Sequence, residues 1–77
     1  MHQPTLKHFL LRQKVLALYR RALRSSKAIA DPATRRETIT WIRSEFERNR
    51  HLTDVVTIEE QLRLGRREIS QILPSTR

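Results

Sequence analysis

The chain has 77 residues, with 16 basic and eight acidic side chains and a formal net charge of +8. This length limits it to one domain, with a core close to the smallest that folds alone. Because there is no cysteine, disulfide bonds and thiolate-bound zinc or iron–sulfur clusters are excluded. One glycine and three prolines leave little room for hairpins, so the composition favours a small helical protein.

The charge is unevenly distributed along the chain. Residues 1–30 hold seven basic and no acidic side chains, whereas residues 31–77 are nearly balanced. An acid-free, basic and amphipathic N-terminal third is typical of a mitochondrial targeting segment and equally of an ordinary basic helix, and both interpretations stay open here. No apolar run approaches the roughly 20 residues that cross a bilayer, and no secretory signal is recognisable. Stable membrane insertion and secretion are therefore not expected.

The first predicted helix runs from about residue 6 to residue 27, with Thr5 as its N-cap. At 100° per residue, its apolar side chains share one broad side and its cationic ones fall on the other. The apolar set is Leu11, Val15, Leu18, Tyr19, Ala22 and Leu23, and the cationic set is Lys14, Arg20, Arg21 and Arg24. We expect the apolar side to pack in the core and the other side to face a partner or solvent.

The second predicted helix spans residues 32–50. Asp31 followed by Pro32 is a strong start signal, as N-cap and first helical residue. Thr34 and Glu37 match a capping box that offers an alternative start one turn later. The apolar stripe of this helix is thin and carries arginines on and beside it, which is unusual for a purely structural helix. Its apolar members are Ile39, Ile42 and Phe46, with Arg35 in the same stripe, Arg43 and Arg50 flanking it and Trp41 nearly opposite.

A third helix is predicted over residues 54–73, opened by Thr53 and Asp54. Its apolar positions repeat at spacings of three and four. They are Val55, Ile58, Leu62, Gly65, Ile69 and Ile72. For Gly65 a close helix–helix contact is the favoured explanation, and space left for a ligand is the alternative. Together the segments predict an all-α fold, a three-helix antiparallel bundle in a single domain over residues 1–77.

No catalytic or metal-binding pattern is recognisable. None of the three histidines lies three or four positions from another, and adjacent acids such as Glu59 and Glu60 are typical of a solvated helix face. There is also no glycine-rich phosphate loop and no nucleophile elbow. We therefore expect neither catalysis nor a metal site.

Binding remains, and two kinds of partner compete. A net charge of +8 fits a basic helical nucleic-acid-binding domain, but the basic residues are spread over all three predicted helices. Phe9, Tyr19 and Phe46 are assigned to the core, which leaves no platform for stacking bases. Arginine outnumbers lysine 13 to 3, and an acidic protein partner explains these arginines equally well. A peripheral membrane helix is a weaker alternative, because the apolar face of residues 6–23 is needed as core.

Several stretches resemble the LYR-motif (complex 1 LYR) family, small three-helix adaptors of the mitochondrial matrix. The resemblance covers about residues 5–73 and combines a tripeptide with a downstream phenylalanine block. It is carried by Leu18-Tyr19-Arg20, residues 5–9, Arg12-Gln13, Val15-Leu16, Arg21 and residues 41–49. It implies a protein that binds the mitochondrial acyl carrier protein, whose acyl chain inserts between the helices. It further implies a client respiratory complex, expected to be complex I, and no nucleic-acid partner.

The resemblance also implies which residues meet the carrier. Matched by position, the docking residues are Arg12, Tyr19, Arg20, Arg43, Arg48 and Arg50. The acyl tunnel is expected to be lined by Leu16, Leu23, Ile39, Ile42, Phe46, Ile58 and Leu62. Glu47 departs from the pattern of some relatives, which have a basic residue there, so Arg48 is expected to take over that contact. For Tyr19, core packing and lining of the tunnel stay open as comparable roles, whereas core packing is the favoured sole role of Phe46. No cofactor of its own is expected, because the carrier supplies the acyl-phosphopantetheine.

Overall fold

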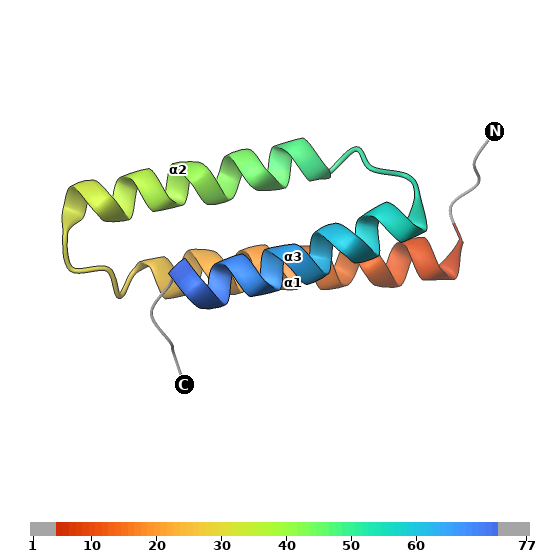
Figure 1. Cartoon of the computed structure of the whole chain (residues 1–77), viewed down its shortest axis with the longest axis horizontal. Helices are drawn as coiled ribbons and strands as arrows, with labels where there is room; N and C mark the ends of the chain where they lie inside the picture. Colours follow the sequence, from red (N-terminus) through yellow and green to blue (C-terminus); the bar gives the residue numbers. More distant parts are fainter. Residues whose placement is uncertain (1–4, 73–77) are drawn as a thin grey trace.

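The computed structural model describes residues 5–72 of the chain. These residues form three helices and no strand, namely α1 (Leu6–Ser26), α2 (Pro32–Asn49) and α3 (Val55–Ile72). Successive helices run in opposite directions, so α1 and α3 point the same way (Figure 1). The predicted all-α, three-helix bundle is confirmed. The helix ends differ from the predicted ones by one residue, apart from residue 73, which lies outside the described residues.

The helices begin at the residues that the capping signals indicate. The capping residues are Thr5, Asp31 and Asp54, and each side chain accepts a hydrogen bond from the backbone N–H three residues later, at 3.3, 2.8 and 2.9 Å respectively. Asp31 precedes Pro32 at the first helical position, which confirms the earlier of the two predicted starts. Hydrogen bonds from the Thr34 hydroxyl and N–H lower the pKa of the Asp31 carboxyl, so this cap is ionised at neutral pH.

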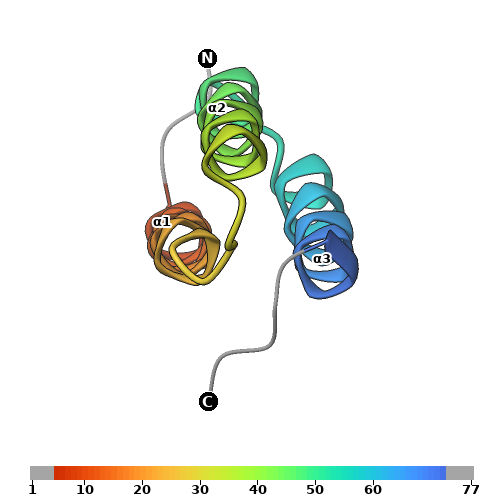
Figure 2. The same cartoon turned by 90° about the vertical axis from the view of Figure 1, so that its left-hand side faces the viewer.

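Helix α1 is the central element of the bundle. It packs against both α2 and α3, whereas α2 and α3 have few direct contacts, and the end-on view shows the three helices at the corners of a triangle (Figure 2). Its residues Leu11, Leu18 and Ala22 are buried. Residues 6–26 of the basic, acid-free segment thus form an integral helix of the folded domain.

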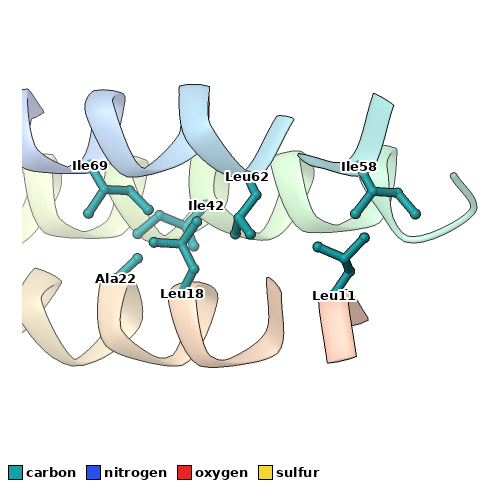
Figure 3. Close-up of a cluster of buried hydrophobic side chains, with 7 residues drawn as sticks. All are labelled: Leu11, Leu18, Ala22, Ile42, Ile58, Leu62 and Ile69. Carbon is teal, nitrogen blue, oxygen red and sulfur yellow. The ribbon is translucent and has the colours of Figure 1, made fainter. Parts of the chain in front are cut away.

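The core lies where α1 faces the other two helices (Figure 3). Its buried apolar residues are Leu11, Leu18, Ala22, Ile42, Ile58, Leu62 and Ile69. Helix α2 contributes only Ile42 to this set, which is 1% exposed, so its thin predicted stripe amounts to one fully buried side chain. Val15, Tyr19 and Leu23 are partly buried around the cluster, which confirms the predicted apolar side of α1.

Two aromatic side chains lie where the sequence did not place them. Phe9, which was assigned to the core, is 57% exposed, because its position is half a helical turn away from the buried Leu18. Trp41, which was expected nearly opposite the apolar stripe, is partly buried and packs against the core. It lines a small cavity together with Gln61 and Gly65 of α3. The physical reason is that this side of α2 is turned toward α3 across that cavity, although the two helices have few direct contacts.

Gly65 lies where α3 comes close to α1. A Cβ atom built on its backbone would lie 3.2 Å from the Cδ2 atom of Leu18, which is tighter than ordinary van der Waals contact. Its φ is not positive, so the glycine is required for space and not for an unusual backbone conformation. The close helix–helix contact favoured from the sequence is confirmed.

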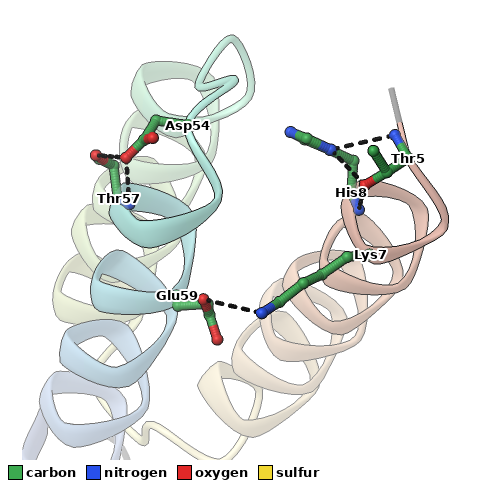
Figure 4. A network of polar contacts seen from close by, with 6 residues as sticks. All are labelled: Thr5, Lys7, His8, Asp54, Thr57 and Glu59. Atoms are coloured by element: carbon green, nitrogen blue, oxygen red, sulfur yellow. Dashed lines mark hydrogen bonds and ion pairs between the residues drawn. The ribbon is translucent and has the colours of Figure 1, made fainter. Parts of the chain in front are cut away.

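Near the start of α1, the side chain of the buried His8 contacts Thr5 and points toward the segment before α3 (Figure 4). The side chain of His8 is buried, with its Nε2 atom 2.7 Å from the Thr53 carbonyl oxygen and its Nδ1 atom 3.2 Å from the Thr5 nitrogen. Because the Thr5 N–H can only donate, Nδ1 accepts, and Nε2 carries the proton that it donates to Thr53. An exposed ion pair between Lys7 of α1 and Glu59 of α3 links these two helices, with 3.6 Å between the Lys7 Nζ and Glu59 Oε1 atoms. No sequence pattern pointed to His8.

We expect His8→Ala to lower the free energy of unfolding by about 1–3 kcal/mol, because the Thr53 carbonyl loses its buried donor and the first turn of α1 loses half of its capping box. Urea denaturation followed by circular dichroism measures this change. The control is His51→Ala, which removes an exposed histidine and should change stability by less than about 0.5 kcal/mol. Equal losses in the two variants would contradict the structural role of His8.

Candidate functional site

A mostly apolar groove runs between α1 and α2. It has a larger chamber of about 320 Å³ and a smaller one of about 160 Å³. The larger chamber alone reaches the range of roughly 300–1,000 Å³ that is usual for small-molecule sites. It is lined by Leu16, Tyr19, Arg20, Leu23, Ile42, Arg43, Phe46 and Glu47. The smaller chamber is lined by Arg12, Val15, Leu16, Phe46, Asn49, Arg50, Leu52 and Ile58.

Leu16 of α1 and Phe46 of α2 line both chambers, so the two chambers adjoin at these residues. Both side chains are partly buried. The Phe46 ring also packs edge-on against the Tyr19 ring, with 5.0 Å between the ring centroids and 73° between the ring planes. Phe46 is therefore a packing residue and a wall of the groove at the same time.

Four exposed arginines border the groove, and we call them the cationic rim. Arg20 and Arg43 line the larger chamber, and Arg12 and Arg50 line the smaller one. Glu47 lies on the same side of α2 and forms an ion pair with Arg50 at 3.1 Å. The site thus combines an apolar floor with a positively charged border, which suits a ligand with an acyl or other apolar tail attached to an acidic partner.

Arg48 lies apart from the cationic rim. Its guanidinium forms an ion pair with Glu45, and Glu45 lines a small cavity together with Gly65 and Ile69 of α3. This side of α2 faces α3 and not the groove. The structure therefore brings together four of the five predicted docking arginines and separates Arg48 from them.

Comparison with known proteins bears directly on this arrangement. The model of the family described as "Complex 1 protein (LYR family)" matches residues 13–71, which include the second half of α1 and all of α2. The chain belongs to the LYR family. Relatives named "LYR motif-containing protein 2" are 43% identical in Xenopus tropicalis, 38% in Rattus norvegicus and 35% in Homo sapiens. Each match covers 68 residues, or 88% of this chain, and 77–78% of the relative. No solved structure matches the chain.

In this LYR protein, the three residues of the motif have three different environments. Leu18 is buried in the core, 7% exposed, and its side chain meets Gly65 of α3. Tyr19 is partly buried and lines the larger chamber of the groove. Arg20 is exposed and belongs to the cationic rim. The motif therefore places a core residue, a groove-lining residue and a residue of the cationic rim at consecutive positions of one helix.

The Tyr19 side chain separates the groove from the interior of the bundle. It also lines two cavities of about 20 Å³ each, which lie toward α3. The Asn49 side-chain amide donates a hydrogen bond to the Tyr19 hydroxyl at 3.2 Å, so α1 and α2 are linked at this point. Burial raises the pKa of the Tyr19 phenol against the opposing effect of this hydrogen bond, and the hydroxyl keeps its proton at neutral pH. Tyr19 both packs and lines the groove, which were the two roles left open by the sequence.

Most of the predicted lining residues of the LYR protein lie in the groove, and two do not. Those in the groove are Leu16, Leu23, Ile42, Phe46 and Ile58. Leu62 lines one of the small cavities toward α3, and Ile39 lines neither chamber. Asn49 and Leu52, which do line the smaller chamber, were missed because they lie at and beyond the end of α2, where the helical period gives no signal. Within residues 5–72, no helix is both long and apolar enough to cross a membrane.

Proposed function

We propose that this chain is a non-catalytic adaptor of the mitochondrial matrix that binds an acylated acyl carrier protein. The observation that carries the proposal is the apolar groove between α1 and α2 with its cationic rim. In the proposal, the acyl chain on its phosphopantetheine arm lies along the apolar floor, and acidic side chains of the carrier meet the arginines. The carrier supplies this group, so the adaptor contributes only the binding surface.

The client of the adaptor is proposed to be respiratory complex I. The description of the matching family, "Complex 1 protein (LYR family)", supports this client. Membership of the LYR family also supports the proposal that this chain assists the assembly or activity of a complex and does not itself catalyse a reaction. We propose that the carrier and this chain act on the client as a pair.

Native mass spectrometry of this chain, co-expressed with an acyl carrier protein, tests the proposal. We expect a 1:1 complex whose mass includes phosphopantetheine with a long acyl chain, and no complex when the carrier is unacylated. The absence of a complex with every carrier form would refute the proposal. Salt-sensitive retention of nucleic acid in the same samples would then favour the nucleic-acid-binding alternative.

A charge reversal in the cationic rim tests how the partner is recognised. We expect Arg43→Glu combined with Arg50→Glu to weaken carrier binding about tenfold or more at low salt, because acidic carrier groups would then be repelled. The effect should shrink as salt screens the charges. Helical content should stay unchanged, because both side chains are exposed.

The matched control is Arg63→Glu combined with Arg67→Glu, which changes the net charge equally at exposed positions of α3. The control should retain carrier binding within about twofold if location matters more than net charge. An unfolded Arg43/Arg50 variant by circular dichroism would instead assign these arginines a structural role and remove the support for an acidic docking surface.

A further inference from the structure

A second apolar surface lies on α1, on the side opposite to the core. The side chains of Leu6, Phe9 and Leu10 are 73, 57 and 50% exposed. Leu6 and Leu10, four residues apart, lie on one face of the helix, and Phe9 lies beside it. The other large apolar side chains exposed among the described residues, Val56 and Leu64, lie on α3. The start of α1 thus presents an apolar cluster that nothing in the described chain covers.

This face continues into cationic residues along the same helix. We call the stripe on one side of the helix the outer face of α1, and it consists of Leu6, Leu10, Ala17, Arg21 and Arg24, whereas Phe9 lies in line with Leu16 and Arg20 on the groove side. All five side chains are exposed, and none of them lines the groove between α1 and α2. In the described part of the chain, Arg21 and Arg24 form no ion pair with a carboxylate. From residue 6 to residue 24 the face is about 27 Å long, enough for a substantial interface.

The pattern of the outer face indicates what kind of partner fits it. Apolar anchors four residues apart are typical of a helix that lies in an apolar groove of a protein. Exposed arginines at the other end require acidic groups on the partner. A second copy of the chain fits poorly, because each copy carries a net charge of +8. A bilayer surface also fits poorly, because the large apolar side chains end at residue 10 and do not continue along the helix.

We infer that the outer face of α1 docks onto the client, at an apolar groove of the client that ends in acidic side chains. This inference rests on the proposed function and adds a separate surface to it. The carrier occupies the groove between α1 and α2, and the client occupies the opposite border of α1. One helix then contacts both partners at once, with Arg20 on the carrier side and Arg24 on the client side.

The test uses the purified complex of this chain with the acylated carrier, titrated onto immobilised, purified respiratory complex I. One variant, Leu6→Gln with Leu10→Gln, removes the apolar anchors of the outer face and keeps good helix formers. A second, Arg21→Glu with Arg24→Glu, reverses the cationic end. We expect each variant to weaken binding to complex I at least about tenfold while native mass spectrometry still shows the carrier bound. Only the second effect should shrink with added salt.

The matched control is Val56→Gln with Leu64→Gln, which removes two exposed apolar side chains from α3 and should leave both partners bound. Undiminished binding of complex I to both outer-face variants would overturn the inference, as would an equal loss in the control. Binding to anionic phospholipid vesicles that depends on Leu6 and Leu10, while complex I still binds both variants, would also overturn it. If the unmodified chain binds the carrier but not complex I, the inference fails and carrier binding stands; if it binds neither, the proposed function fails as well.

Discussion

Removal of the acyl chain from the carrier is expected to weaken its binding to this protein by at least about a thousandfold. Burial of ten acyl methylenes contributes roughly 8 kcal/mol before ordering costs, at about 0.8 kcal/mol each. An exposed ion pair of the kind that the cationic rim offers contributes only about 0.2–1 kcal/mol. A thousandfold change in the dissociation constant requires about 4 kcal/mol. The acyl chain supplies this free energy even if ordering costs offset half of its gain. The arginines then select and orient the partner.

Isothermal titration calorimetry with carriers that bear no acyl chain, a short one or a long one measures this dependence. Affinity should rise with chain length until the groove between α1 and α2 is filled. The Arg43/Arg50 charge-reversal variant serves as the control, because it should lose a similar factor in affinity for carriers that bear the short and the long acyl chain. Equal affinities for the acylated and unacylated carrier would show that the groove does not hold the acyl chain.

Ile42→Ala is expected to lower the free energy of unfolding by about 2–5 kcal/mol and to weaken binding of the acylated carrier. Ile42 is the one α2 side chain in the buried cluster, 1% exposed, and it also lines the larger chamber of the groove. The substitution therefore leaves a cavity in the core and removes part of the groove wall. In a domain of this size, whose total stability is expected near the lower end of about 5–15 kcal/mol, the loss is enough to populate the unfolded chain.

Urea denaturation and calorimetry measure the two effects, and Ile39→Ala is the matched control. It makes the same chemical change on the same helix, but Ile39 is only partly buried and lines neither chamber. We expect the control to lose less than about 1.5 kcal/mol and to keep its affinity. Saturating acylated carrier should restore about 2.7 kcal/mol to either variant at a hundred times its dissociation constant. Equal effects of the two substitutions would contradict the placement of Ile42 in both core and groove.

Short-range signals determined where the helices begin and which side of α1 is buried. The N-caps Thr5, Asp31 and Asp54 act on a backbone N–H only three residues away, so the sequence around each helix start is sufficient to locate it. The strong period of α3 likewise predicted its apolar positions, of which Ile58, Leu62 and Ile69 are buried. The motif and the phenylalanine block were enough to indicate the family, which the family match confirms.

Only the tertiary structure decided how α2 is used. Its apolar stripe is thin, and the helix touches α1 on one side and faces α3 on another, so periodicity alone does not show which side chains belong to which contact. Packing placed Trp41 toward α3, separated Arg48 from the cationic rim and kept Ile39 out of the groove. Exposure of Phe9 was decided in the same way, because α2 and α3 together cover only part of the surface of α1. The sequence by itself determined the helices, their caps and the family, whereas the groove and the outer face of α1 depend on long-range contacts that fix the rotation of each helix about its axis.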